Sequence, residues 1–204
     1  MTHWLMFSVV FPILAAALSF RDDSDLVARL KRRDPDAMSE LYNRYGRMMY
    51  SLILRIVRND AVAEDLVQET FLRVWNRVHG FDQDRGALGP WVLTVARNRA
   101  IDYLRSVQGR DLESPLEAER MENPSLFLNL ETDILNIDRM RRLKTAFEKL
   151  TPNQRTVIEL AYYEGLSQTE MSEHLKQPLG TVKTWVRTAL KLLREELEEQ
   201  QVVA

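Results

Sequence analysis

The chain has 204 residues, of which 45% are hydrophobic and 28% are charged, and this composition excludes both a fibrous and a disordered protein. It contains no cysteine, so disulfides and thiolate metal sites are excluded, which suits a reducing cytosol. Its 28 Lys and Arg side chains face 30 Asp and Glu, and the net charge of −2 excludes a strongly basic protein that grips DNA alone.

Residues 1–20 form an apolar leader in which no side chain is charged at neutral pH. No Lys or Arg precedes the apolar run, Pro12 interrupts it, and a length under about 20 residues is marginal for a membrane span. Three interpretations stay open: translation from a start site upstream of the true one, a helix with a packing or membrane-surface role, and a signal peptide cleaved near residues 15–17.

Residues 21–108 show helical periodicity, and we expect them to form a first all-helical domain. Asp23 to Leu30 opens a helix, and Asp34-Pro35 marks the next start because proline is favoured at the first helical position. From Ala37 on, the apolar residues that recur at steps of three and four are Leu41, Tyr45, Met48, Met49, Leu52, Ile53 and Ile56.

Asn59-Asp60 ends this helix, and a further helix is expected over about Ala61–Val78. A loop with three glycines and a proline follows, HGFDQDRGALGP, and the last helix of the domain runs from Trp91 to near Gly109. The residues expected to be buried on the Ala61–Val78 helix are Leu66, Val67, Phe71, Val74 and Trp75.

Residues 109–131 are predicted to be a linker, since they contain two prolines and six acidic residues and show weak periodicity. Residues 132–204 form a second helical domain, in which Thr151-Pro152 caps a helix that stops at Gly165. The predicted fold class is therefore all-α: two small helical domains joined by a linker, the C-terminal one a helix–turn–helix.

The helix–turn–helix lies in LSQTEMSEHLKQPLGTVKTWVRTALKLLREEL, where Ser167 and Glu170 form the S-x-x-E signature of a helix start. The first helix is expected to end at Lys176, Gly180 is expected to permit the turn, and Thr181 is expected to cap the second helix. The residues of the second helix that should face its partners are Val182, Val186, Leu190 and Leu193.

This pattern leaves polar residues exposed at the N-terminal end of the second helix, where recognition helices meet bases and where the helix dipole favours phosphate. These candidate DNA-binding residues are Thr181, Lys183, Thr184 and Arg187. The alternative is a surface hairpin whose basic side chains are solvated and paired with neighbouring glutamates.

Two further surfaces are candidates. The polar side of AEDLVQETFLRVW, with Asp65, Gln68 and Glu69, is either a solvated helix face or a protein-binding surface. The loop from His79 and the helix after it bring aromatic rings near arginines and an asparagine, which suits unpaired bases. The alternative places both aromatic residues in the core and the arginines in solvent, and the position of Trp91 at the head of an apolar stripe favours the core for that residue. The residues concerned are Phe81, Trp91, Arg97, Asn98, Arg99 and Arg105.

Three blocks occur in this order: DAVAEDLVQETFLRVW, PWVLTVARNRAIDYLR and LTPNQRTVIELAYYEGLSQTEMSEHLKQPLGTVKTWVRTALKLLREEL. With this order and the linker between them, the chain resembles the extracytoplasmic-function (ECF) sigma factors of the sigma-70 family over roughly residues 23–197. The resemblance implies a cytoplasmic, dissociable subunit of RNA polymerase that directs promoter recognition and opening, not an enzyme, with no cofactor or metal.

The resemblance also assigns expected roles to residues. Asp65, Gln68 and Glu69 would contact the β′ clamp coiled coil of core RNA polymerase. Phe81 and Asn98 would line the pocket for a flipped base of the −10 element, with Arg97 and Arg105 on the backbone nearby. The −35 element would be read by Lys183, Thr184 and Arg187 near Thr181, beside Trp185, where the family usually has a small or basic residue.

Promoter DNA and core polymerase are the expected partners, together with an anti-sigma factor, which in this family is often membrane-bound. Polymerase would supply much of the nonspecific binding to DNA, so a chain with a net negative charge could still carry a DNA-reading helix–turn–helix. The rival interpretations are a stand-alone helix–turn–helix regulator, a membrane-tethered or secreted protein, and an enzyme. The sequence does not support the enzyme interpretation. The carboxylates Glu64, Asp65 and Glu69 have no convergent histidine. The histidines, His3, His79 and His174, lie far apart in the sequence without metal-ligand spacing.

Overall fold

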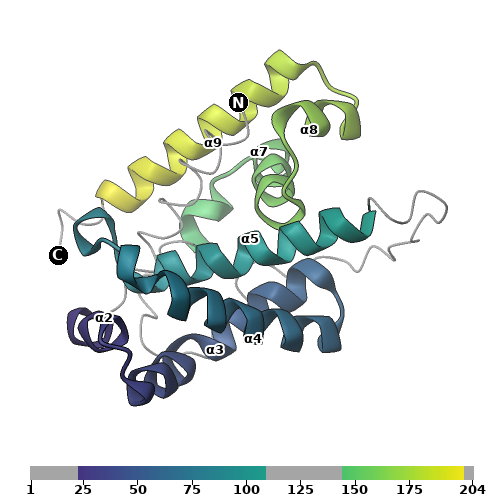
Figure 1. Ribbon diagram of the computed structural model, residues 1–204. Coiled ribbons are helices and arrows are strands. Elements are labelled where there is room, and N and C mark those ends of the chain that lie inside the picture. The colour runs from purple at the N-terminus through teal and green to yellow at the C-terminus, as the bar shows by residue number, and fades with distance from the viewer. Residues whose placement is uncertain (1–22, 109–143, 200–204) are drawn as a thin grey trace. The chain divides into compact units, whose positions relative to one another are not determined.

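The computed structural model describes residues 23–108 and 144–199 (Figure 1). In these two ranges all regular elements are helical, and the chain divides into two compact units, called here the N-terminal domain (23–108) and the C-terminal domain (144–199). The all-α prediction is confirmed. The leader 1–20 and the linker 109–131 lie outside the described residues. Within the described residues, no helix combines the length and the apolarity that crossing a membrane requires.

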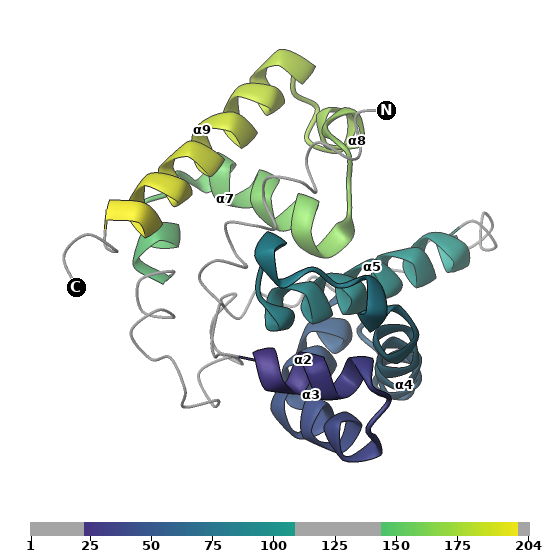
Figure 2. The ribbon, with the colours of Figure 1, turned by 60° about the vertical axis from the view of Figure 1, so that its left-hand side comes forward.

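In the N-terminal domain a long central helix, α3, packs against α4 and α5, and the short α2 lies against α3 (Figure 2). Two 3-10 turns, η1 and η2, connect α4 to α5. The bounds are α2 Ser24–Lys31, α3 Pro35–Val57, α4 Asp60–Arg77, η1 Val78–Gly80, η2 Gln83–Arg85 and α5 Leu88–Gln108.

The helix starts follow the capping residues. Asp34 caps α3 by accepting a hydrogen bond from the Asp36 amide at 3.0 Å, and Pro35 occupies the first turn as predicted. Asn59 caps α4 by accepting from the Val62 amide at 3.0 Å. Side-chain oxygens thus satisfy amides that have no partner within the helix.

Helix α5 begins at Leu88 rather than at the predicted Trp91. Pro90 fits inside the first turn, because its missing N–H would have no intrahelical acceptor there. Gly89 is required by a close approach: a Cβ at this position would lie 2.8 Å from Cε1 of Tyr45 on α3. The start of α5 therefore packs directly on the Tyr45 ring.

The predicted apolar faces are buried in the core of the N-terminal domain, except that Met48, Leu52 and Trp75 are only half-buried. The buried members of the predicted set are Leu41, Tyr45, Met49, Ile53, Ile56, Leu66, Val67, Phe71 and Val74.

A network of charged side chains joins α2 to α3. The buried Asp23 carboxylate accepts from Arg44 Nη1 and from the Tyr45 hydroxyl, both at 2.5 Å. Arg44 also pairs with Glu40, and Arg29 donates to Glu40 at 2.7 Å. The hydrogen bond from Arg29 holds the pKa of the Glu40 carboxyl below its ordinary value. These bonds hold α2 in place and leave Asp23 paired.

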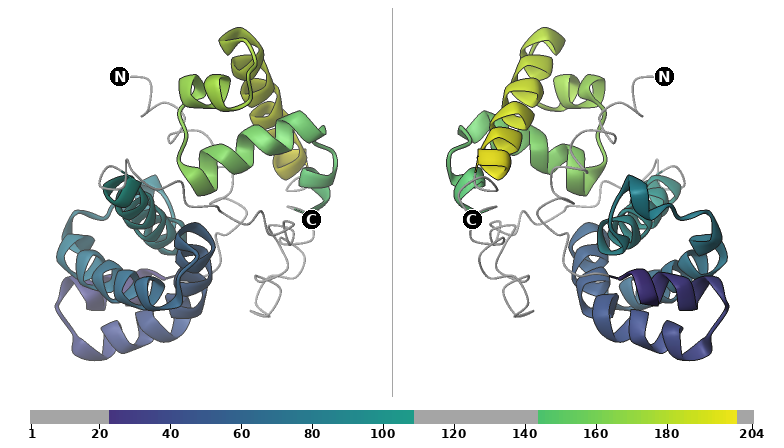
Figure 3. Two further views of the ribbon diagram at one scale, coloured as in Figure 1. Left: turned by 90° about the vertical axis from the view of Figure 1, so that its right-hand side faces the viewer. Right: turned by 90° about the vertical axis from the view of Figure 1, so that its left-hand side faces the viewer.

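In the C-terminal domain, residues 144–148 are helical, and α7, α8 and α9 follow, with a π-helical turn, η3, directly after α7 (Figure 3). Helix α9 packs against α7 and α8. The bounds are α7 Pro152–Glu159, η3 Leu160–Glu164, α8 Gln168–His174 and α9 Leu179–Glu199.

The predicted signals for α7 and α8 are confirmed. Thr151 and Gln154 form a capping box at α7, and Ser167 and Glu170 form another at α8. Gly165 takes a left-handed conformation with φ of 65° and ends η3. The π-helical turn itself has no counterpart in the sequence prediction.

The predicted turn between α8 and α9 was wrong in two details. Thr181 does not cap α9, because the helix already begins at Leu179 and the amides of Thr181 and Val182 donate to the Pro178 carbonyl at 2.9 and 3.1 Å. Gly180 lies inside the helix, and the left-handed residue of the turn is Lys176, with φ of 52°. Proline has no N–H, so it can precede the first turn, and its carbonyl starts the helical hydrogen bonds.

Candidate functional site

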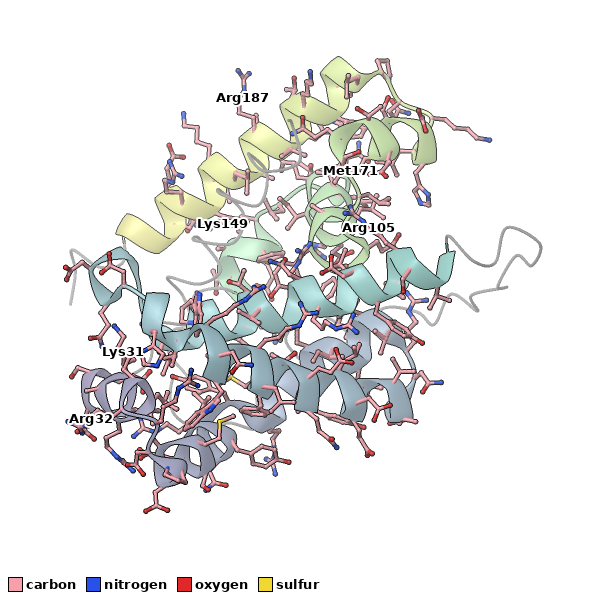
Figure 4. All side chains as sticks on the ribbon, viewed as in Figure 1. Lys31, Arg32, Arg105, Lys149, Met171 and Arg187 are labelled. Atoms are coloured by element: carbon pink, nitrogen blue, oxygen red, sulfur yellow. The ribbon has the colours of Figure 1, made fainter. Side chains whose placement is uncertain are left out.

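The outer face of α9 carries exposed basic side chains. Lys183, Thr184 and Arg187 are exposed, and Arg187 projects away from the helix in Figure 4. Among the described residues, neither Lys183 nor Arg187 forms an ion pair or hydrogen bond through its side chain. Thr181 is half-buried in the first turn. The predicted set therefore shares one end of the helix, with Thr181 the least accessible member.

The opposite face of α9 fixes how this surface is presented. The four apolar residues predicted to face inward are all buried, and Met171 of α8 is fully buried with them. Gln154 of α7 donates to the Thr188 hydroxyl at 3.0 Å, and Lys149 Nζ bonds Glu196 at 2.6 Å. Packing and polar contacts along its length thus hold α9 rigid while its outer face stays open. The four buried residues are Val182, Val186, Leu190 and Leu193.

The loop between α4 and α5 is anchored by a buried ring. Phe81 is 7% exposed, and its ring centroid lies 5.0 Å from that of Trp91 at a tilted angle of 41°. The next residues, Asp82, Gln83 and Asp84, are exposed. Phe81 therefore belongs to the core in this structure, which is the alternative that the sequence left open, while its DNA contact stays a prediction.

On α5, Asn98 and Arg105 are exposed, but Arg97 is 3% exposed. Arg97 Nη1 donates to the Asn98 side-chain oxygen at 3.2 Å. A signal for this burial was present in the sequence, because Arg97 lies four residues after Leu93 and four before Ile101, both of which are buried. A phosphate contact by Arg97 stays a prediction, and the buried guanidinium does not favour it.

The outer face of α4 carries the predicted protein-binding residues. Asp65, Gln68 and Glu69 are exposed along it. The Arg99 Nε atom on α5 donates to Glu69 Oε2 at 2.5 Å, and this hydrogen bond holds the pKa of Glu69 below its ordinary value. The pair ties the α4 face to the helix that carries Asn98.

Two exposed apolar side chains that the sequence prediction missed belong to the same domain. Leu72 is 60% exposed and follows Glu69 by one helical turn, and Tyr42 of α3 is 58% exposed. The Tyr42 ring centroid lies 5.1 Å from that of Phe71. The spacing of Leu72 from Asp65 and Gln68 could have revealed its place on that face.

The described residues contain no group of three or more His, Cys, Asp or Glu side chains that could hold a metal ion.

Two family models match the chain, one for each domain. Sigma-70 region 2 matches residues 41–110, and Sigma-70, region 4 matches residues 140–193. The first match contains the α4 face and the α4–α5 loop, and the second contains α8 and the part of α9 up to Leu193.

Relatives match over most of this chain and over most of their own length. An ECF RNA polymerase sigma factor SigK from Mycolicibacterium vanbaalenii is 33% identical over 171 residues, which cover 83% of this chain and 86% of the relative. The SigK protein of Mycobacterium tuberculosis is 34% identical over 181 residues, covering 87% of this chain and 96% of the relative. Among solved structures, Rhodobacter sphaeroides SigE in complex with the anti-sigma ChrR is 29% identical, covers 85% of this chain and 97% of its own, and gives a TM-score of 0.45.

Proposed function

The chain belongs to the ECF sigma factors of the sigma-70 family, which direct RNA polymerase to promoters for transcription initiation, and we propose how its surfaces divide that task. In this proposal residues 21–108 bind core polymerase and the −10 element, and residues 132–204 bind the −35 element. Residues 109–131 are the linker.

Helix α9 reads the −35 element in the major groove. The observation that carries this proposal is the pair of exposed cations, Lys183 and Arg187, which no described carboxylate neutralises, on a helix whose opposite face is buried. Arginine can bond both acceptors of a guanine edge, whereas a lysine at this end suits a phosphate or a single acceptor. Thr184 and Thr181 lie in the same first turns, and the half-buried Trp185 lies between Thr184 and the buried Val186.

The −10 element is bound by α5 and the loop before it. Asn98 and Arg105 supply exposed polar groups, and Asn98 contacts a flipped base in this proposal. Arg97 orients the Asn98 side chain through its hydrogen bond, and the Phe81 ring packs on Trp91 beneath the loop. Direct DNA contacts by Phe81 and Arg97 require a conformation in which they are less buried.

The outer face of α4 docks on the β′ clamp coiled coil of core polymerase. Asp65, Gln68 and Glu69 present two carboxylates and an amide to solvent there. Such a face suits a partner that is basic and helical, and polymerase then contributes much of the nonspecific hold on DNA.

The same protein is regulated by an anti-sigma factor in the cytoplasm. This proposal is supported by one of its relatives, since the Rhodobacter sphaeroides SigE structure holds the anti-sigma ChrR. The relatives are transcription regulators rather than enzymes, and the proposal assigns no catalytic residue to the chain.

Runoff transcription with purified core polymerase tests the proposal. The template is a pool of duplexes with both promoter elements randomised, and the transcribed templates are sequenced to find enriched bases. We expect enrichment at two elements with a fixed spacing between them. A stand-alone helix–turn–helix regulator would instead bind duplex without polymerase and enrich one element, and failure to bind core polymerase would exclude the sigma function.

A further inference from the structure

We propose that the α2–α3 turn, residues 31–34, positions the loop after α4 for promoter reading, with Lys31 and Arg33 as its positioning residues. This inference rests on the proposed function of that loop at the −10 element. The two side chains reach across the domain from one turn to two backbone carbonyls, those of Trp75 and Phe81.

Lys31 fixes the point where the exposed part of the loop begins. Its Nζ atom donates to the Phe81 carbonyl at 2.8 Å, although the two residues are 50 positions apart. The Phe81 amide donates to the Val78 carbonyl at 3.1 Å, and the Phe81 ring packs on Trp91. The residue is thus held through its amide, its carbonyl and its ring, and a charged donor makes the Lys31 bond the stronger kind.

Arg33 fixes the end of α4, from which the loop departs. Its Nη1 atom donates to the Trp75 carbonyl at 2.6 Å, and its guanidinium carbon lies 5.1 Å from the centre of the Trp75 ring. Carbonyls in the last turn of a helix lack an intrahelical donor and favour a nearby cation. The contact over the ring adds a cation–π attraction.

The backbone conformation of Arg33 supports a positioning role for its side chain. Its φ is 63°, in the left-handed region that favours glycine. Glycine would adopt this conformation more easily, but it could not reach Trp75. The strain at this residue is therefore compensated by contacts that its side chain makes with α4.

Arg32 provides a matched control between the two positioning residues. It carries the same charge, its side chain is exposed, and it forms no side-chain hydrogen bond or ion pair with any other residue in the described ranges. In Figure 4 Lys31 lies on the side of α2 toward the loop, whereas Arg32 lies at the outer side of the helix.

Loss of these contacts should affect the −10 element but not the −35 element. Asp82, Gln83 and Asp84 are exposed beyond Phe81, so their place depends on how firmly Phe81 is held. Loss of the hydrogen bond to the Phe81 carbonyl should lower base selectivity at the −10 element. It should leave the −35 element unaffected, because α9 belongs to the other domain.

The test is the randomised-promoter selection, run with full-chain holoenzyme carrying Lys31→Met, Lys31→Arg, Arg32→Met or Arg33→Gly. We expect Lys31→Met to lower base enrichment at the −10 element by about tenfold, as for loss of one charge-assisted hydrogen bond. Enrichment at the −35 element should stay within about twofold in every variant. Lys31→Arg should restore most of the loss, Arg32→Met should match the parent, and Arg33→Gly should show a smaller loss than Lys31→Met.

Amide hydrogen exchange of the same variants reports the loop directly. In Lys31→Met the Phe81 amide should exchange faster while α3 amides keep their protection, and in Arg32→Met both should match the parent. Equal −10 enrichment in Lys31→Met and the parent would overturn the inference, and so would equal losses in Lys31→Met and Arg32→Met. If the parent itself selects no −10 sequence, the proposed function of the loop fails and the inference fails with it.

Discussion

In the N-terminal domain several arginines are bound to carboxylates and carbonyls of the same domain, whereas Lys183 and Arg187 on the outer face of α9 are exposed to solvent. Arg29, Arg44 and Arg99 each form an ion pair of 2.8 Å or less. Lys183 and Arg187 form none among the described residues. The first group stabilises a fold, and the second is available to a ligand.

Charge counts do not reveal this difference. Residues 21–108 hold 15 basic and 13 acidic side chains, and residues 146–204 hold 7 and 9, so the second segment has the lower net charge. The segment with fewer cations nevertheless exposes a basic surface. Pairing, rather than net charge, therefore separates Arg29, Arg44 and Arg99 from Lys183 and Arg187.

The largest expected effect tests the structural role of the paired cations. Asp23→Ala leaves Arg44 and the Tyr45 hydroxyl without their buried acceptor, so we expect the free energy of unfolding of the N-terminal domain to fall by about 3 kcal/mol. Asp25→Ala is the control, because Asp25 is 80% exposed and pairs at only 3.7 Å; it should cost less than about 0.5 kcal/mol.

Urea unfolding followed by hydrogen exchange measures both domains separately in the same sample. The C-terminal domain should keep its protection in both variants. If the two substitutions had equal effects, the Asp23 network would not stabilise the fold.

The next effect concerns the unpaired cations. Arg187→Ala should weaken binding of holoenzyme to its selected −35 duplex about tenfold or more, as for loss of a base contact. The thermal midpoint should not change, since the side chain forms no hydrogen bond or ion pair with a described residue. Fluorescence anisotropy and calorimetry measure the two quantities, and a lower midpoint would place Arg187 with the structural arginines instead.

Lys183→Ala should have a smaller and more uniform effect. If Lys183 binds a phosphate, affinity falls for selected and unselected duplexes alike, and the slope of log affinity against log salt concentration decreases by about 1. Binding isotherms at several salt concentrations measure this slope. An unchanged slope with altered base preference would move Lys183 to the base-reading group.

The smallest effect concerns the exposed pair between Arg99 and Glu69. The hydrogen bond from Arg99 lowers the pKa of Glu69 in the folded state, so the pair stabilises the fold above the unfolded-state value and is lost as pH falls through the folded-state value. Arg99→Met should raise the pKa of Glu69 toward its ordinary value. The change in unfolding free energy at neutral pH should stay below about 1 kcal/mol, because Glu69 is 47% exposed.

An NMR titration of the Glu69 carboxyl carbon checks this pKa in the parent and in Arg99→Met. Arg73→Met is a suitable control, because Arg73 acts on Glu69 through its charge without a hydrogen bond. Identical titration curves in the parent and Arg99→Met would show that the pair does not persist in solution.

The local signals in the sequence predicted most of the fold. Capping residues such as Asp34, Asn59 and Thr151 act within one turn, so their effect can be read without tertiary information. The α8–α9 turn was mispredicted because Gly180 has no need of its conformational freedom, while Lys176 takes the left-handed conformation.

The site was predicted less completely, because burial and pairing depend on distant residues. Exposure of Lys183 and Arg187 followed from the period of one helix. The burial of Arg97 and Phe81 and the bond from Lys31 to Phe81 required knowledge of how the helices pack. The periodicity of one helix therefore predicts which of its faces is exposed. Packing between helices decides which side chains on that face remain unpaired and accessible to a ligand.

The contact between Gly89 and Tyr45 has a consequence for how freely the chain can vary. The Tyr45 hydroxyl is held by Asp23, so the ring cannot swing aside without breaking the α2 network. In a saturation library selected for promoter activity, position 89 should tolerate almost no side chain, even alanine. Position 80 should tolerate many, because Gly80 is exposed and a Cβ there would have no atom within 4 Å. A residue with no side chain would then rank among the least replaceable in the domain.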